Sequence, residues 1–340
     1  MQRKPLLGAI AVLSAFLPGI IVTSSPSFAD ETIKPAVVYS TGGKFDGAFN
    51  QSAFTGAEKF KTDTGIDYRE FELRNDTQSQ QAIRTFARDG HDPVVVIGFQ
   101  QASALAEVAP EFPETRFAIV DMVVDQPNVQ SVVFREHEGS FIVGMLAAMA
   151  SNSNTIGAVG GMDIPLIRRM TCGYQLGAYY VKSDANVLVN FVGTTGAAWN
   201  DPIRGGELTK TQIGKGADVV LQLAGGTGIG VLQAASDAKI LGIGSDANQN
   251  GLHPGQVLTS MVKHVDVAVY EAFKAAREGN WQPGIKSLGL AEGGIDWALD
   301  ENNRDLMTDD MKVAAKQAKA DIISGKITIH DYMIDNTCPN

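Results

Sequence analysis

Charged side chains follow several short apolar runs of this 340-residue chain, at the points where buried strands would end. They are Asp46, Asp121, Asp246 and Lys263. Because a carboxylate accepts two hydrogen bonds in parallel, such groups suit a sugar diol or the N–H edge of a ring. Taken singly, each aspartate is more often a helix cap or a turn former. Four charged groups at strand ends in both halves of the chain favour a binding site, because open α/β sheets bind ligands there.

The loop after the first apolar run carries further polar groups. Asp46 and Asn50 lie in this loop, after Gly42–Gly43 ends the apolar run at 36–39. Phe54 lies off the apolar stripe of the helical pattern that follows, so we expect its ring to face a ligand. The stripe consists of Phe49, Ala53, Ala57 and Phe60. An ordinary strand–loop–helix turn capped by Asp46 explains the same residues.

Motifs of common enzyme classes are incomplete in this sequence. The glycine-rich loop at 224–230 lacks the third glycine of a dinucleotide-binding fingerprint, and neither a Gly-x-Ser-x-Gly elbow nor a Walker loop is found. The backbone N–H groups of this loop suit a polar ligand instead. Two cysteines and five scattered histidines do not make a zinc motif. We therefore expect no catalytic residues of these classes, no metal and no cofactor.

Short apolar runs alternate with helical patterns along the chain, which is typical of parallel sheets covered by helices on both faces. Strands are predicted at 36–39, 67–72, 93–98, 116–120, 129–134, 155–159, 187–191, 218–223, 240–244 and 257–262. Helices are predicted after 48 and at 77–89, 102–109, 138–150, 164–181, 201–215, 230–236, 266–277 and 308–324. Short elements at 288–291 and 295–299 are also expected. The pattern restarts at Thr155, so we predict two Rossmann-like α/β lobes.

The predicted boundaries of the lobes follow from this restart of the pattern. We place the first lobe at 30–150, the second at 151–262, and assign 263–340 to a crossover helix and elements shared between the lobes. The strand at 129–134 is expected to leave the first unit. The helix at 138–150 is rich in small residues, which would allow close packing of backbones.

The first 29 residues differ from the rest of the chain. Arg3 and Lys4 precede an apolar run at 6–22, and Ser27-Phe28-Ala29 fits a small-x-small cleavage site. This pattern predicts a cleaved signal peptide at 1–29; an uncleaved membrane anchor is the alternative. No cysteine stands at the cleavage point, so we expect a periplasmic protein without a lipid anchor.

Charge and cysteine content narrow the partners and the compartment. Loss of Arg3 and Lys4 with the leader takes the formal net charge from −10 to −12, so a nucleic-acid partner is not expected. In an oxidising compartment Cys172 and Cys338 either form one disulfide that ties the tail to the second half or remain independent thiols. Their spacing does not decide between these possibilities.

Seven stretches, in one order along the chain, carry a family resemblance. They are FDGAFNQSAF (45–54), FAIVD (117–121), EGSFIVG (138–144), VGGMDIPLIRR (159–169), WNDPIRG (199–205), GSDAN (244–248) and SMVK (260–263). The chain thereby resembles the basic membrane protein (Bmp) family, the purine-nucleoside-binding substrate-binding proteins of bacterial ABC importers. The resemblance implies a periplasmic-binding-protein clamp of type I, with a hinge between two lobes.

The resemblance also implies ligand contacts in the first lobe and at the aromatic positions. It implies that Asp46 and Asn50 contact the ligand, that Asp121 binds the edge of the base, and that Phe54 and Trp199 stack on the base. Relatives often have phenylalanine at the position of Trp199, so the width of the pocket is open.

Further implied contacts come from the second lobe. Asp246 and Lys263 match the residues that bind the ribose, and either Gly225 or Gly226 matches a backbone contact. For the block at 159–169 we favour a structural or hinge role over ligand binding.

We therefore predict a monomeric receptor that closes on a purine nucleoside and delivers it to an ABC transporter permease. The alternatives are a receptor for a free nucleobase or another small polar metabolite, and a secreted nucleoside hydrolase.

Overall fold

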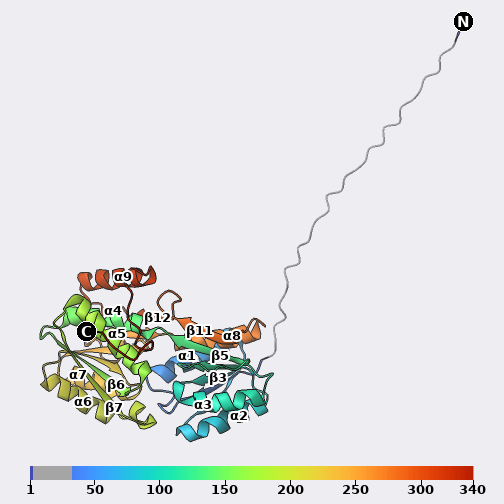
Figure 1. Cartoon of the computed structure of the whole chain (residues 1–340), viewed down its shortest axis with the longest axis horizontal. Coiled ribbons are helices and arrows are strands. Elements are labelled where there is room, and N and C mark those ends of the chain that lie inside the picture. The colour runs from blue at the N-terminus through green and yellow to red at the C-terminus, as the bar shows by residue number, and fades with distance from the viewer. Residues whose placement is uncertain (3–32, 340) are drawn as a thin grey trace.

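The computed structural model describes residues 1–2 and 33–339. The leader predicted at 1–29 lies, apart from its first two residues, outside this part. Within residues 33–339 the strands form two six-stranded sheets, each in its own lobe (Figure 1). The predicted pair of α/β lobes is confirmed.

The first sheet is parallel throughout, in the order β11-β5-β4-β3-β1-β2. Its strands are β1 (Ala36–Tyr39), β2 (Arg69–Glu72), β3 (Val94–Ile97), β4 (Phe117–Val120), β5 (Val129–Phe134) and β11 (Gly284–Leu288). The central strands β1, β3 and β4 are apolar and buried along their whole length, because helices cover both faces of the sheet.

The second sheet repeats this order as β12-β10-β9-β8-β6-β7, with β12 antiparallel to β10. Its strands are β6 (Thr155–Met162), β7 (Asn186–Gly193), β8 (Val219–Leu223), β9 (Leu241–Asp246), β10 (Val257–Lys263) and β12 (Ile295–Trp297). β6 continues through Gly160 and Gly161, where the sequence pattern predicted its end.

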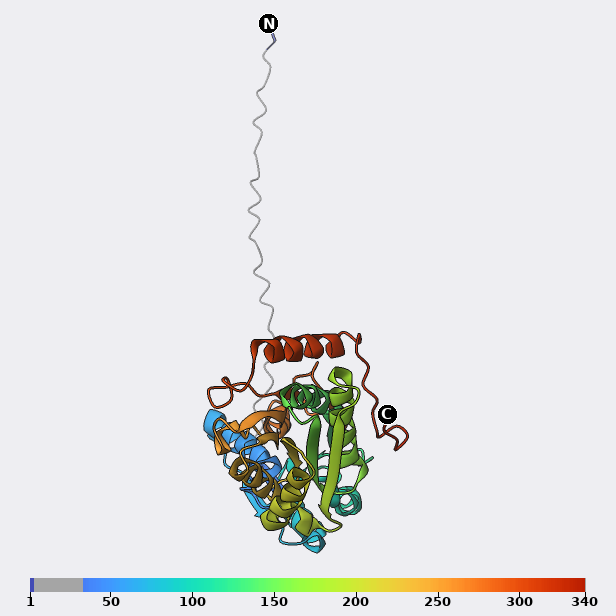
Figure 2. The ribbon, with the colours of Figure 1, turned by 90° about the vertical axis from the view of Figure 1, so that its left-hand side faces the viewer.

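Nine α-helices lie within residues 33–339, and eight of them cover the faces of the two sheets. They are α1 (Phe49–Thr64), α2 (Ser79–Arg88), α3 (Ala102–Val108), α4 (Glu136–Ala150), α5 (Pro165–Val181), α6 (Pro202–Gly214), α7 (Thr227–Asp237), α8 (Val265–Arg277) and α9 (Asp309–Ile323). In the first lobe, α2 and α3 cover one face and α1 and α8 the other (Figure 1). In the second lobe, α4 and α5 lie opposite α6 and α7, and α9 lies outside α4 (Figure 2).

Between residues 33 and 339 the chain passes three times from one lobe to the other. The crossovers are Arg135 between β5 and α4, His264 between β10 and α8, and 289–294 between β11 and β12. They lie side by side at the junction of the two sheets, so this junction is the hinge expected for a clamp.

Two expectations about the junction differ from the structure. The prediction that Val129–Phe134 leaves the first unit is wrong, because β5 pairs in parallel with β4 and is buried on both faces. Helix α4 was expected in the first lobe but packs against α5 of the second, so the sheets divide the chain near Arg135 and not at 150.

The close approach of α4 and α5 explains the small residues of α4. A Cβ atom added at Gly144 would lie 2.1 Å from the carbonyl oxygen of Tyr174, and one at Gly177 would lie 1.9 Å from that of Phe141. The predicted close packing of this helix is confirmed. In the described part of the chain, no helix is long and apolar enough to cross a bilayer.

Candidate functional site

A cavity lies between the lobes, at the carboxyl ends of strands from both sheets. It has an empty volume of about 560 Å³, which includes space open to solvent. It is lined by Ser40, Gly42, Asp46, Phe49, Asn50, Gly98, Phe99, Gln100, Asp121, Leu166, Ile167, Met170, Trp199, Leu223, Gly225, Asp246 and Lys263. Seven of the nine predicted site residues are therefore brought together, and Phe54 and Gly226 are not in this lining.

Asp46 both caps helix α1 and lines the cavity. Its carboxylate accepts hydrogen bonds from the backbone N–H groups of Ala48 (2.8 Å), Asn50 (3.0 Å) and Gln51 (3.1 Å). The Asn50 side chain donates to the same carboxylate and accepts from the backbone N–H of Ser40. Burial raises the pKa of Asp46 to about 6, despite these hydrogen bonds. Asp46 can therefore cap the helix and also serve as a binding group in the cavity.

Asp121 and Asp246 occupy matching places at the ends of β4 and β9. Both have left-handed backbones, with φ of 72° and 65°. Such a conformation is uncommon for residues other than glycine and costs energy that the surrounding structure must supply. Burial raises the pKa of both carboxyls.

Lys263 ends β10 and is almost fully buried among carboxylates. Its Nζ lies 2.7 Å from Asp121, 3.4 Å from Glu136 and 3.8 Å from Asp246. Burial acts to lower the pKa of Lys263, but these carboxylates outweigh it and the pKa lies above its ordinary value. Lys263 therefore joins Asp121, expected to bind the edge of the base, and Asp246, expected to bind the ribose, in one cluster of charges.

Glu136 was missed by the sequence analysis, although it is fully buried and contacts Lys263. It is the first residue of α4 and the second residue after the end of β5. The helical pattern was taken to begin at Glu138. An acid two residues past the end of a predicted strand was the available signal.

The aromatic rings at the cavity are Phe49, Phe99 and Trp199. Trp199 packs over Gly161, where a Cβ atom would lie 2.4 Å from the indole ring. Phe99 meets Trp199 edge to face, with ring centroids 6.3 Å apart. The ring of Phe49 lies 4.9 Å from Lys263 Nζ.

Phe54 lies apart from this group of rings. Its ring packs edge to face on Phe45 and lies 4.9 Å from Lys44 Nζ. Because α1 starts at Phe49, its first turn faces the cavity, and Phe54 stands more than a turn further along the helix. The stacking contact expected of Phe54 stays a prediction, and Phe49 is the ring that the structure brings to the cavity.

The glycine-rich loop meets the cavity through Gly225, which has a positive φ of 56°. A Cβ atom there would lie 3.8 Å from the Asp46 carboxylate. Gly226 lies beside the carbonyl oxygen of Trp199. Of the two glycines between which the resemblance left a choice, Gly225 is the one at the cavity.

Helix α5 supplies an apolar wall through Leu166, Ile167 and Met170. These residues belong to or directly follow the block at 159–169, for which a structural or hinge role was favoured. Arg169 of the same block donates to the carbonyl oxygen of Phe134 at the first crossover (2.6 Å). The block thus contributes to both the cavity and the hinge.

Two polar atoms at the cavity are buried and have no hydrogen-bond partner in the described part of the chain. They are Oδ1 of Asp121 and Nε1 of Trp199. A buried polar group without a partner is rare and unfavourable in proteins. Two residues that line the cavity thus carry one acceptor and one donor without a partner in the described part of the chain.

Comparisons with known proteins identify the family of the chain. The model of the Bmp family, described as ABC transporter substrate-binding protein PnrA-like, matches residues 33–331. An ABC transporter nucleoside-binding protein, BmpA, of Lactococcus lactis subsp. cremoris is 32% identical over 320 residues, covering 87% of this chain and 89% of its own. A lipoprotein of Pyrococcus horikoshii is 32% identical over 317 residues, covering 88% and 78%.

Solved structures show the same fold. An ABC transporter solute-binding protein of Aeropyrum pernix K1 matches with a TM-score of 0.81 at 28% identity, over 88% of this chain and 94% of that one. The two-lobed binding-protein fold of type I is therefore confirmed.

Proposed function

The chain belongs to the Bmp family of ABC transporter substrate-binding proteins, and we propose that its interlobe cavity binds a purine nucleoside and presents it to the permease of an importer. The observation that carries this proposal is the convergence on one cavity of polar groups and rings from both lobes. The relative from Lactococcus lactis is named a nucleoside-binding protein, which supports the choice of ligand.

Each end of a nucleoside has suitable partners in the cavity. Asp246 and Lys263 bind the ribose hydroxyls, because a carboxylate accepts and an ammonium donates hydrogen bonds. Asp121 accepts from the edge of the base with its Oδ1 atom, which lacks a partner in the described chain. Trp199 stacks on one face of the base, and Phe49 or Phe54 on the other. Asp46, Asn50 and the backbone at Gly225 complete the polar contacts.

Closure of the lobes about the hinge traps the ligand. The three crossovers within 33–339 allow rotation, and residues from both lobes must meet for the cavity to form. In this structure Gln249 of the second lobe donates a hydrogen bond to the carbonyl oxygen of Gly47 in the first (3.0 Å). This bond joins the lobes beside Asp46, so it stabilises the arrangement that encloses a ligand.

The protein is an extracytoplasmic substrate-binding protein, as its family is. We place it in the periplasm as a monomer released by cleavage of residues 1–29. The relative from Pyrococcus horikoshii is named a lipoprotein, whereas the proposal for this chain is release without a lipid anchor.

Identification of the copurifying small molecule by native mass spectrometry tests the proposal, followed by calorimetric titration with adenosine, adenine and ribose. We expect a nucleoside in the purified protein and binding of adenosine well above that of adenine or ribose. Tighter binding of adenine identifies a nucleobase receptor, and preference for ribose identifies a sugar receptor. Release of hypoxanthine from inosine identifies a hydrolase, and each of these results overturns the proposal.

A further inference from the structure

A series of ion pairs leads from the C-terminal segment of the chain to the cavity. Asp331 binds Arg169 through two parallel hydrogen bonds, of which Nε to Oδ1 measures 2.7 Å. Arg169 Nη1 lies 3.1 Å from Glu136, and Glu136 lies 3.4 Å from Lys263 Nζ. Because Lys263 lines the cavity, residues far from the ligand are linked to it by consecutive charged contacts.

Arg169 also holds the first crossover on both sides. Its Nη1 donates to the carbonyl oxygen of Phe134, the last residue of β5, and also to Glu136, the first residue of α4. Its side chain is only 12% exposed. A guanidinium is planar and its donors have a fixed geometry, so the pair with Asp331 sets the plane in which Arg169 meets the crossover.

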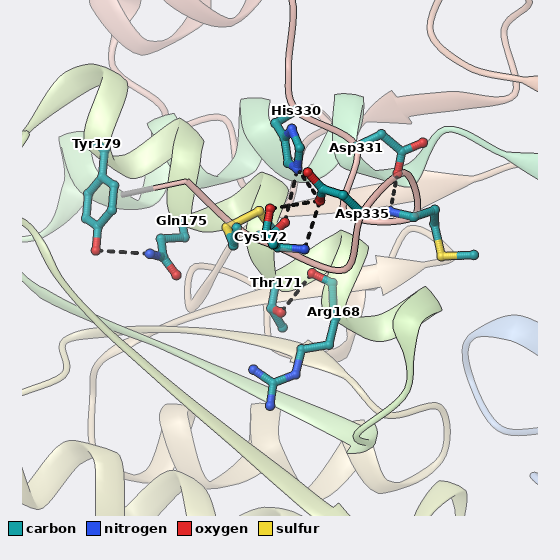
Figure 3. Close-up of a disulfide and its surroundings, with 11 residues drawn as sticks. Arg168, Thr171, Cys172, Gln175, Tyr179, His330, Asp331 and Asp335 are labelled. Carbon is teal, nitrogen blue, oxygen red and sulfur yellow. Dashed lines mark hydrogen bonds and ion pairs between the residues drawn. A yellow bond between two sulfur atoms is a disulfide. The ribbon is translucent and has the colours of Figure 1, made fainter.

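The C-terminal strap, residues 325–339, is anchored where Asp331 meets Arg169. Cys338 of the strap forms a disulfide with Cys172 on α5, three residues after Arg169 and therefore on the same side of the helix. Figure 3 shows this disulfide beside the loop that carries His330, Asp331 and Asp335. The strap is thus attached to α5 at two adjacent points, one covalent and one ionic.

We propose that Asp331 is a positioning residue for the ligand site: through Arg169 and Glu136 it fixes Lys263 in the cavity, so that the strap sets the affinity for the ligand. This inference rests on the proposed function for the identity of the ligand, but the ion pairs it uses do not depend on it. Without Asp331, the guanidinium loses the partner that orients it. When the guanidinium turns, Glu136 loses its contact with Arg169 and is left with Lys263 as its cation. Glu136 then draws Lys263 away from Asp121 and Asp246.

The experiment compares Asp331→Asn with Asp335→Asn in the oxidised full chain. Both changes remove one negative charge from the strap, but Asp335 accepts hydrogen bonds from Thr337 and His330 within the strap itself. The first measurement is amide hydrogen exchange of residues 129–140 without ligand. The second is the dissociation constant of adenosine.

We expect Asp331→Asn to speed exchange at 129–140 and to weaken adenosine binding by about three- to thirtyfold, the range for residues coupled to a distant site. Asp335→Asn leaves both quantities unchanged. Asp331→Glu restores the carboxylate and recovers most of the affinity, which a purely steric role would not produce.

Unchanged exchange at 129–140 in Asp331→Asn overturns the inference, as does an equal response of Asp335→Asn. Faster exchange with an unchanged adenosine affinity also overturns it. If the wild-type chain binds no nucleoside while exchange responds as expected, the proposed function fails and the positioning network is supported.

Discussion

In the first lobe Asp121 directly follows β4, and in the second lobe the strand at the same place in the sheet, β9, ends at Asp246. Both residues have a left-handed backbone and face one cavity. The neighbouring strands β3 and β8 are followed by Gly98 and Gly225, which also have positive φ. The two lobes therefore bring their aspartates to the cavity with similar backbone geometry.

The side chains that follow the equivalent strands β1 and β6 differ sharply. After β1 come Asp46 and Asn50, held in a hydrogen-bonded cap. After β6 come Leu166, Ile167 and Met170 of an apolar helix face. At this one equivalent strand, therefore, the first lobe contributes polar groups to the cavity and the second contributes apolar ones.

Lys263 of the second lobe is a buried cation at the junction of the lobes. Among the variants considered, its removal is expected to have the largest effect on the free energy of unfolding. Lys263→Met leaves the carboxylates of Asp121, Glu136 and Asp246 buried without the ammonium. We expect a loss of about 3–5 kcal/mol in the free energy of unfolding, as for a broken buried ion pair. Urea denaturation measures it.

The matched control for this prediction is Lys319→Met. Lys319 pairs with Asp296 near the surface, where both side chains are about a third exposed. We expect a change of about 1 kcal/mol or less there. Equal losses in the two variants would show that the cluster at the junction has no special role.

The polar loop of the first lobe gives the next effect, a dependence of stability on pH. The carboxyl of Asp46 has a pKa of about 6 in the folded protein against 3.8 ordinarily. Between these values the unfolded chain is ionised while the folded chain keeps the proton. The contribution of Asp46 to stability is therefore highest below about pH 4 and falls as the pH rises to about 6, by about 3 kcal/mol in total.

The variant Asp46→Asn tests whether Asp46 causes this pH dependence of stability, because the amide does not titrate. We expect the fall in stability between pH 4 and 6 to become shallower in urea denaturation curves recorded at half-unit intervals. Asp309→Asn, at a highly exposed helix start, should keep the wild-type slope. A slope in Asp46→Asn equal to that of the wild type would contradict the assignment.

The variant Asp246→Ala tests the contribution of the second lobe's strand-end aspartate to ligand binding. We expect a loss of at least about 1–3 kcal/mol in binding of adenosine, because ligand hydroxyls are left without partners. Isothermal titration calorimetry with adenosine measures this loss. An unchanged affinity would show that the second lobe does not bind the ribose through Asp246.

The apolar wall of the second lobe gives the smallest effect. Ile167→Val removes one methylene group from a side chain that is 5% exposed, and we expect a loss of about 0.5–1.5 kcal/mol in stability. Val313→Ala, at an exposed position of α9, is the control and should change little. Thermal unfolding of both variants tests whether this wall is tightly packed.

Much of the fold was predictable because short apolar runs and helical periodicity are local signals. The strand at 36–39 and the charged groups at strand ends were read correctly from residue types alone. Helix α4 was assigned to the wrong side of the junction because its lobe is decided by packing against α5 and not by its position in the chain.

The sequence predicted which residues belong to the candidate site better than it predicted the contacts among them. Sequence spacing indicated Asp121 and Lys263 separately, but only the fold places them 2.7 Å apart. The ring of Phe49 was assigned to the core because it continues the apolar stripe of α1, and the register of the first helical turn turns it to the cavity. The pairing of Cys172 with Cys338 depends on a contact across 166 positions, about which spacing carries no information.

The threefold crossing of the chain has a consequence for synthesis. The edge strand β11 of the first sheet is made about 150 residues after β5, beside which it lies. Until then the ribosome has produced a first lobe whose β5 edge is open to pairing with other chains. Neither lobe can be obtained by a single cut of the polypeptide, so the receptor matures only when nearly all of it has emerged.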